Sequence, residues 1–229
     1  MISFQNISKV YQAGTKPIIA LSNVSFEVKL GEFVSVVGRS GAGKTTLLKL
    51  FLAEERPSSG HIIFESQDIH QIKPHYLPNF RREIGVVFQD YKLLPSKTTY
   101  ENIAYVLEVM GASDADIAND VVRVLDLVGL TNRAQSFPEE LSGGERQRAA
   151  IARALVHQPK VILADEPTGN LDPYHTKDII RLLAKINEMG TTVILATHNQ
   201  DIINSLEKRV ITLEEGKIIR DEERGRFTL

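Results

Sequence analysis

The sequence predicts an α/β protein with a mainly parallel sheet, an antiparallel β layer near its N-terminal end and an inserted α-helical lobe. Strand-like runs without intervening helices fill residues 2–28. Strands and helices then alternate, and between residues 90 and 160 amphipathic helical stripes interrupt that alternation. With 229 residues and 42% hydrophobic content, the chain is long enough to bury the core of one large domain.

The predicted helical lobe rests on two apolar stripes with helical spacing. The first comprises Ile103, Val106, Leu107 and Met110, and the second Ile117, Val121, Val124, Leu125 and Val128. Such stripes are typical of helices that pack in a core, so we assign these residues to packing. Ser113 and Asp116 have the spacing of a helix cap, and Gly129 is suited to ending the second helix.

A glycine-rich segment, GRSGAGKT, occupies residues 38–45 and fits the pattern Gly, four residues, Gly-Lys-Ser/Thr. Its glycines, Gly38, Gly41 and Gly43, permit a tight loop whose backbone closely approaches a phosphate. The β-branched run FVSVV leads into this loop, and TTLLKLFLA after it has a helical pattern, so a chance match is disfavoured. The predicted phosphate-binding residues are Gly38, Arg39, Ser40, Gly41, Ala42, Gly43, Lys44, Thr45 and Thr46.

Two side chains of this loop have distinct expected tasks. Lys44 supplies a positive charge for the β- and γ-phosphates of a nucleotide such as ATP. Thr45 offers a hydroxyl oxygen to Mg²⁺, which prefers hard oxygen ligands. Arg39 either adds positive potential near the phosphates or faces solvent, and the sequence leaves both open.

A pair of carboxylates, Asp165 and Glu166, follows the apolar run VILA, which is suited to a strand buried on both faces. Successive strand side chains point in opposite directions, so the pair can perform separate tasks. We expect Asp165 to hold the Mg²⁺ shell and Glu166 to orient and deprotonate an attacking water. A charged pair can also simply end a strand, but the phosphate loop upstream favours catalysis.

The segment LSGGE, residues 141–145, contains a Ser-x-x-Glu capping box formed by Ser142 and Glu145. A capped helix start with two glycines, Gly143 and Gly144, is also an anion site. Both interpretations can hold together. With the phosphate loop, this segment resembles the signature motif of the ATP-binding cassette ATPases, LSGGQ in its usual form, and the resemblance covers almost the whole chain.

The resemblance implies one nucleotide-binding domain of that fold. Residues 1–89 and 161–229 are expected to form the β layer and a RecA-like P-loop NTPase core, and residues 90–160 the helical lobe with the signature. Gln89 matches the family's Q-loop glutamine, which is implied to contact Mg²⁺ and the attacking water. His198 matches the switch histidine, with an implied contact to the γ-phosphate, although a lone histidine is more often structural.

Further positions match the family pattern. Asn170, Leu171 and Asp172 match the D-loop, which in the family couples the two sites of a dimer, and Asp172 also precedes Pro173 as a suitable helix cap. Tyr11 matches the aromatic residue that stacks on adenine, although a tyrosine near a strand end is common.

The resemblance also implies a dimer, because in this family the signature of one subunit closes over the phosphate loop of the other. The chain carries one set of motifs. We therefore expect a two-fold, head-to-tail homodimer that sandwiches two ATP molecules, with the signature residues supplied by the partner. The expected nucleotide contacts also include Glu145 and Asp172.

Within the family, the stretch FQDYKLLPSKTTYENIAYVLEVMG is most similar to members that act in bacterial cell division. Those members work with an integral membrane protein and other division proteins at the cytoplasmic face of the inner membrane. The other segments, FPEELSGGERQR and EPTGNLD, are shared with lipoprotein-release and efflux systems, which remain the alternative. The expected docking residues for the membrane partner are Tyr91, Leu93, Leu94 and Tyr100.

Composition narrows the remaining classes. The net charge of −2 disfavours a protein that binds nucleic acid through a basic surface. The absence of cysteine fits a reducing compartment. No apolar run approaches the ~20 residues that span a bilayer, so we expect peripheral attachment through the partner. A scaffold that binds nucleotide without hydrolysis is disfavoured by Glu166 and His198.

Overall fold

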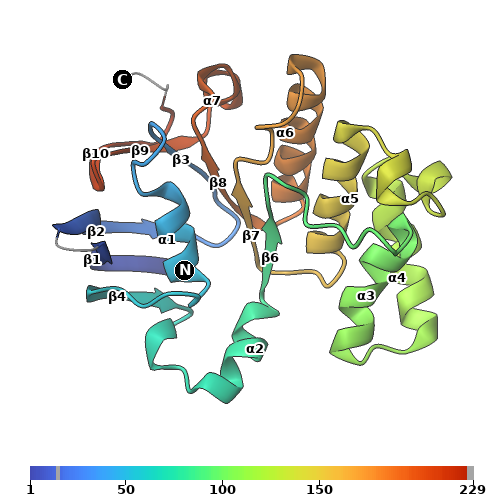
Figure 1. The fold of residues 1–229 in the computed structure, drawn as a ribbon, viewed down its shortest axis with the longest axis horizontal. Coiled ribbons are helices and arrows are strands. Elements are labelled where there is room, and N and C mark those ends of the chain that lie inside the picture. Colours follow the sequence, from blue (N-terminus) through green and yellow to red (C-terminus); the bar gives the residue numbers. More distant parts are fainter. Residues whose placement is uncertain (14–15, 226–229) are drawn as a thin grey trace.

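The computed structural model describes residues 1–13 and 16–225, which form two β-sheets flanked by helices (Figure 1). The smaller sheet has the strand order β2-β1-β4-β5 and is antiparallel. Its strands are β1 (Ile2–Ala13), β2 (Lys16–Val28), β4 (Ser59–Phe64) and β5 (Gln67–Asp68). The expected antiparallel layer is therefore present, and it also recruits two strands that follow the phosphate loop.

The larger sheet has the order β10-β9-β3-β8-β7-β6, and all neighbours except the β10–β9 pair are parallel. Every residue of β3 and β8 is buried, as expected for parallel strands covered on both faces. The strands are β3 (Phe33–Val37), β6 (Ile84–Val87), β7 (Val161–Asp165), β8 (Thr192–Thr197), β9 (Arg209–Glu214) and β10 (Lys217–Glu222). This arrangement confirms the predicted mainly parallel sheet.

The helical lobe lies beyond the β6 edge of this sheet and consists of α3 (Thr99–Met110), α4 (Asp114–Leu127) and the first part of α5 (Gly143–Leu155) (Figure 1). The other helices are α1 (Lys44–Phe51), α2 (Leu77–Arg81), α6 (Pro173–Glu188) and α7 (Gln200–Leu206). Short 3-10 helices span Ile69–Gln71, Pro74–Tyr76, Thr131–Arg133 and Pro138–Glu140. Helix α1 ends at Phe51, whereas the helical pattern TTLLKLFLA in the sequence also included the two residues after it.

The ends of α4 form as predicted. The Ser113 hydroxyl accepts a hydrogen bond from the Asp116 amide at 3.2 Å. After the helix, Gly129 has φ +68°, and the Leu130 amide donates to the Leu125 carbonyl at 2.8 Å. This closure satisfies carbonyls that the last turn leaves unpaired. The second apolar stripe is buried throughout, whereas Val106 and Met110 of the first stripe are only partly buried.

Two hydrophobic clusters cover the two faces of the parallel sheet. One joins the sheet to α5, α6 and the lobe. The other joins it to the antiparallel layer around Phe51, whose ring lies 6.0 Å from Phe4, 5.9 Å from Phe64 and 6.1 Å from Phe80. Aromatic packing therefore fixes α1, and with it the phosphate loop, against the β layer. None of the helices described is long and apolar enough to cross a membrane.

Replacing Gly85 by alanine is expected to destabilise the fold by about 3 kcal/mol, the upper end of the usual cost of overpacking. A Cβ at this β6 position would lie 2.1 Å from the Ala154 carbonyl oxygen, so α5 must move away from the sheet. Urea unfolding measures the loss. The control is Gly129→Ala, where a Cβ meets nothing within 4 Å and only the left-handed backbone costs about 1 kcal/mol. Equal losses in the two variants would contradict the close packing of α5 on β6.

Candidate functional site

The phosphate loop lies between the end of β3 and the start of α1. Gly43 has φ +105°, and a Cβ there would lie 2.5 Å from the Ala20 carbonyl oxygen. A Cβ at Gly38 would lie 2.3 Å from the Leu213 carbonyl oxygen. Both positions therefore require glycine because the loop is pressed against the neighbouring strands. The loop presents backbone amides at a helix start, where an anion is stabilised.

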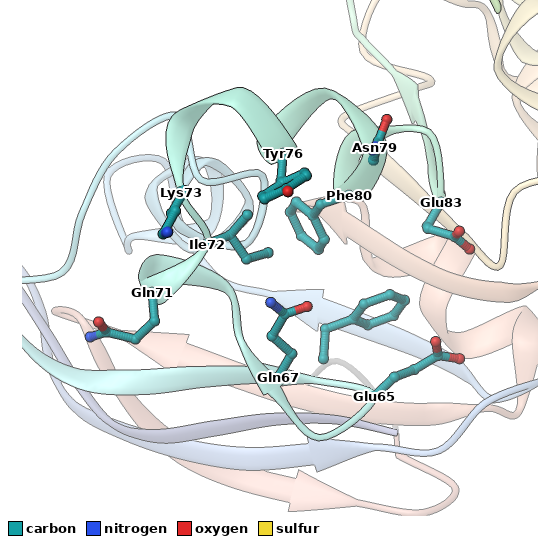
Figure 2. Close-up of a pocket in the computed structure, with 10 residues that line it drawn as sticks. Glu65, Gln67, Gln71, Ile72, Lys73, Tyr76, Asn79, Phe80 and Glu83 are labelled. Atoms are coloured by element: carbon teal, nitrogen blue, oxygen red, sulfur yellow. The ribbon is translucent and has the colours of Figure 1, made fainter.

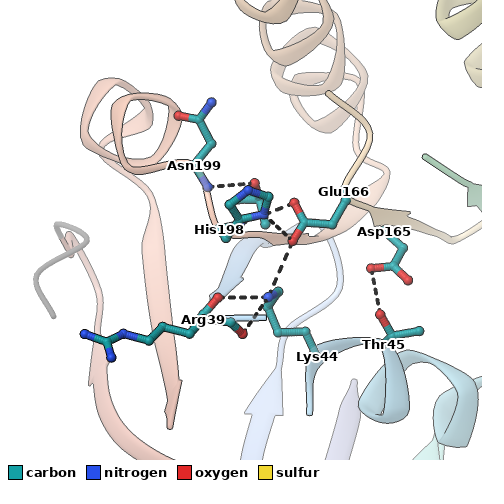
Figure 3. Close-up of polar contacts among 9 residues, drawn as sticks. Arg39, Lys44, Thr45, Asp165, Glu166, His198 and Asn199 are labelled. Atoms are coloured by element: carbon teal, nitrogen blue, oxygen red, sulfur yellow. Dashed lines mark hydrogen bonds and ion pairs between the residues drawn. The ribbon is translucent and has the colours of Figure 1, made fainter. Parts of the chain in front are cut away.

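Lys44 is the central cation of the site (Figure 3). Its side chain is buried, and its Nζ donates to the carbonyls of Gly38 at 2.8 Å and Arg39 at 3.2 Å. The same Nζ lies 3.4 Å from Oε1 of Glu166. The Arg39 side chain is exposed and extends away from this cluster, so it is the main chain of Arg39 that contacts the lysine.

Asp165 is the last residue of β7 and Glu166 follows it, and their side chains diverge as the sequence predicted (Figure 3). Asp165 accepts a hydrogen bond from the Thr45 hydroxyl at 3.3 Å. Burial raises the pKa of Asp165, and the nearby charge of Glu166 adds to that effect while the Thr45 hydrogen bond opposes it. A hydroxyl and a carboxylate at this spacing are hard oxygen donors that suit Mg²⁺. Within the described chain, no cluster of three His, Cys, Asp or Glu side chains is placed to hold a metal.

Besides its contact with Lys44, Glu166 makes hydrogen bonds with His198 and Ala196, and it adopts an unusual backbone conformation. Its Oε1 lies 2.8 Å from Nδ1 of His198, its Oε2 accepts from the His198 amide at 3.3 Å, and its own amide donates to the Ala196 carbonyl at 2.8 Å. Its φ is +47°, a left-handed value that is uncommon outside glycine, asparagine and aspartate and that concentrates at functional sites. The sequence pattern contained no sign of this conformation.

Lys44, Thr45, Glu166 and His198 line one cavity of about 460 Å³. The wall is formed by Tyr11, Ile18, Ile19, Ala20, Ser40, Gly41, Gly43, Lys44, Thr45, Thr46, Gln89, Glu166 and His198. Phosphate-loop and catalytic candidates therefore lie together, with the predicted aromatic residue at the same cavity. Of the other predicted residues, Gly38 and Ala42 are buried, and neither they nor Arg39 and Asp165 line this cavity.

The β2 wall of the cavity adds residues that the sequence reasoning missed. Ile18 and Ile19 are 54% and 61% exposed, unusually high values for isoleucine. They line the cavity with Tyr11, so this end of the site is suited to a flat apolar group. The only available signal was an apolar pair in a strand otherwise expected to alternate. Burial raises the pKa of the Tyr11 hydroxyl, and a hydrogen bond with Glu55 adds to this effect.

Gln89 reaches the cavity from the end of β6. Its carbonyl accepts a hydrogen bond from the Asn170 side chain at 3.0 Å. Its amide group lies against Gly169, where a Cβ would be 2.7 Å from Nε2. The segment containing Asn170 and Leu171 therefore abuts Gln89 within one chain.

The LSGGE segment does not line the cavity of its own chain. The capping box forms as predicted: the Ser142 hydroxyl accepts from the Glu145 amide at 3.3 Å, and the Glu145 carboxylate accepts from the Ser142 amide at 2.8 Å. That second hydrogen bond lowers the pKa of Glu145. Gly144 packs on the ring of His175, and a Cβ would lie 2.5 Å from it. The glycine-rich helix start therefore lies outside the cavity of its own chain, and the phosphate loop that it was expected to complement is that of a partner copy.

Asp172 serves as the cap of α6, as predicted. Its carboxylate accepts from the amides of Tyr174 at 2.9 Å and His175 at 3.0 Å and contacts the His175 ring. The hydrogen bond with that ring is the main reason why the pKa of Asp172 is lowered. Asp172 is exposed and does not line the cavity.

A second hollow of about 600 Å³ lies between the β4–β5 turn and α2 (Figure 2). It is lined by Phe64, Glu65, Gln67, Gln71, Ile72, Lys73, Tyr76, Asn79, Phe80 and Glu83. At its edge, Lys160 pairs with Glu65 at 2.7 Å and Glu83 at 3.1 Å. No phosphate-loop residue lines this hollow, so the smaller cavity is the candidate site.

Comparisons with known proteins agree with this geometry. Residues 21–169, more than half of the chain, match the family described as "ABC transporter". The chain is 49% identical to the cell division ATP-binding protein FtsE of Bacillus subtilis over 99% of its own length and 98% of that protein. It is 50% identical to FtsE of Streptococcus pneumoniae over 99% of its own length and 97% of that protein.

Solved structures of ATP-binding cassettes have the same fold. A dimeric ATP-binding cassette in a post-hydrolysis state, bound to ADP and phosphate, superposes with a TM-score of 0.88 at 36% identity. The alignment covers 99% of this chain and all of that chain. The fold class predicted from the sequence, with its core, β layer and helical lobe, is therefore confirmed.

Replacing Asp165 by asparagine is expected to stabilise the nucleotide-free protein by about 0.5–2 kcal/mol at pH 7. This is a usual gain when a destabilising functional side chain is removed. The raised pKa means that the folded state disfavours the ionised carboxyl. This penalty is present above the folded pKa and disappears as the pH falls below the ordinary value of 3.8. The gain should disappear in the same range.

Thermal unfolding at several pH values provides the measurement. The control is Asp178→Asn on α6, where a partly exposed carboxylate lies 3.8 Å from Arg181 and little change is expected. A loss of stability in Asp165→Asn at pH 7 would mean that the Thr45 hydrogen bond outweighs desolvation.

Proposed function

The chain belongs to the ATP-binding cassette (ABC) transporter family, and from this premise we propose that it drives the membrane protein FtsX in bacterial cell division. It is an ATPase of the FtsE type, with about half of its residues identical to curated FtsE proteins over nearly the whole length. Motion passed to FtsX would regulate hydrolysis of the peptidoglycan wall. The alternative is that the chain is the ATPase subunit of a LolD- or MacB-type lipoprotein-release or efflux system, because those systems share some of its motifs.

One observation supports the catalytic assignment most strongly. Glu166 contacts both Lys44 of the phosphate loop and His198. ATP can occupy the cavity with its adenine against Tyr11 and the β2 isoleucines and its phosphates on the loop. The Lys44 ammonium would then exchange the Glu166 carboxylate for phosphate oxygens. Glu166, still oriented by His198, would be left to accept a proton.

The reaction is hydrolysis of the terminal phosphoanhydride. Glu166 takes a proton from water as the water oxygen forms a bond to the γ-phosphorus, and the bond from that phosphorus to the bridging oxygen breaks. ADP and phosphate are released, and the proton returns to solvent. Mg²⁺, held by Thr45, Asp165 and the Gln89 side chain, would supply positive charge to the phosphates.

We propose that the working site lies between two copies of the chain. The signature residues Ser142, Gly143, Gly144 and Glu145 lie outside the cavity of their own chain and form a capped helix start that can bind an anion. The solved cassette that superposes on this chain is dimeric. A head-to-tail homodimer would bring the signature of one copy over the phosphates bound to the other, with Asp172 at the junction.

The same proposal covers the division of the chain and its place in the cell. Residues 1–89 and 161–229 serve as the β layer and catalytic core, and residues 90–160 as the lobe that receives FtsX. Attachment would be peripheral, at the cytoplasmic face of the inner membrane, with no nucleic-acid partner and with contacts to other division proteins through the complex.

The docking residues proposed for FtsX are Tyr91, Leu93, Leu94 and Tyr100, all partly exposed. Leu93 and Tyr100 also pack on the hydrophobic cluster of the lobe. Leu94 is not part of that cluster, so it is the more suitable probe of docking.

Replacing Glu166 by glutamine is expected to slow ATP hydrolysis by about 10²–10⁴-fold, because the group that accepts the water proton is lost. ATP affinity should change little, since glutamine is isosteric and the phosphate loop is intact. Phosphate release and titration with a fluorescent ATP analogue measure the two quantities. Glu188→Gln, an exposed position at the end of α6, is the control. Retained turnover in Glu166→Gln would remove Glu166 from its role.

Affinity capture tests the partner. Glu166→Gln protein with Mg·ATP is used as bait in detergent-solubilised membranes, and FtsX is the expected product. Leu94→Glu should lower FtsX recovery at least tenfold while ATP affinity stays within twofold, because a carboxylate would be buried at an apolar contact. Leu30→Glu, at a 50% exposed leucine between β2 and β3, is the control. Recovery of a lipoprotein-release or efflux permease instead would overturn the FtsE assignment and leave the ATPase chemistry standing.

A further inference from the structure

The three residues that follow Gln89 form a turn with an uncommon backbone. Tyr91 has φ +60° and Lys92 has φ +51°, so two consecutive residues that are not glycine are left-handed. The Lys92 amide donates to the Asp90 carbonyl at 2.6 Å, and the Lys92 ammonium pairs with the Asp90 carboxylate at 2.7 Å. Such a turn persists only where surrounding structure holds it.

The holding group is Arg153, near the end of α5. Its guanidinium donates to two successive carbonyls of the turn, Tyr91 at 2.9 Å and Lys92 at 2.5 Å. Burial lowers the pKa of Arg153, so this charge has been taken out of water to make these contacts. The rigid fork of a guanidinium suits two neighbouring acceptors, whereas a lysine ammonium is a point charge.

Residues at the start of α5 contact the same turn. The Arg146 guanidinium lies over the Tyr91 ring, 5.5 Å from its centroid. The Tyr91 hydroxyl lies 3.4 Å from where a Cβ on Gly143 would be. The turn therefore contacts both ends of α5, the helix that begins in the signature. Gln89, which precedes the turn, lines the nucleotide cavity.

We infer that Arg153 is a positioning residue that makes the turn after Gln89 and the signature helix α5 move as one unit. A shift of Gln89 on nucleotide binding would then be delivered directly to Ser142, which the second copy needs to close its site. This inference rests on the proposed ATP-dependent dimer. It assigns Arg153 no contact with ATP: its effect would be on dimer closure.

The test uses the full chain in a Glu166→Gln background, which holds ATP without turnover. Sedimentation velocity with Mg·ATP gives the dimer dissociation constant, and titration with fluorescent ADP gives the affinity of the single-chain cavity. Arg153→Met should weaken the dimer at least tenfold, while ADP affinity stays within twofold. Arg153→Lys should recover part of the loss because it can still reach one carbonyl.

The matched control is Arg123→Met on α4, an exposed arginine of the same lobe that pairs with Asp120 at 2.9 Å, for which no change is expected. Thermal unfolding is measured for each variant. An equal dimer constant in Arg153→Met, or parallel losses of dimerisation, ADP affinity and melting temperature, would overturn the inference and leave a merely structural role. Failure of the Glu166→Gln parent to dimerise with ATP would overturn the proposed dimer, and this inference with it.

Discussion

The contact between Lys44 and Glu166 is the interaction on which the rest of the site depends. It joins the phosphate loop after β3 to the end of β7, and His198 extends the link to the end of β8. These strands are neighbours in the parallel sheet, so their carboxyl ends meet at one edge. The aromatic packing of Phe51 holds α1 and the loop in place beneath that contact. The sheet order therefore brings together, from distant parts of the chain, the cation proposed to bind phosphate and the carboxylate proposed to accept a proton from water.

A second constraint acts through the lobe. The signature helix α5 packs on β6 at Gly85 and on α6 at His175, and its capped start does not line the cavity of its own chain. In the proposed head-to-tail dimer, each copy would therefore contribute to both sites, with its cavity at one and its signature at the other. Because the turn after Gln89 contacts α5 through Arg153 and Arg146, we infer that the position of the signature depends on the position of Gln89.

Much of this could be predicted from the sequence where a local rule applied. The phosphate loop, the Asp172 cap and the helix ends of the lobe depend on neighbours within a few residues, and all formed as expected. The left-handed backbone of Glu166, the β2 wall at Ile18 and the Arg153 clamp depend on contacts between segments far apart in the chain. No periodicity or spacing encodes such contacts, because they arise only when the sheet and lobe are assembled.

The central claim is that the phosphate loop of one copy meets the signature of another. The chain contains no cysteine, so thiols can be introduced without background. Ser40→Cys and Ser142→Cys proteins, each in the Glu166→Gln background, are mixed and treated with a short bismaleimide, and covalent dimers are identified by mass spectrometry of the linked peptides. We predict a link between positions 40 and 142 in the mixture with Mg·ATP and not with ADP. Absence of that link with ATP, while both thiols remain reactive, would contradict the head-to-tail site.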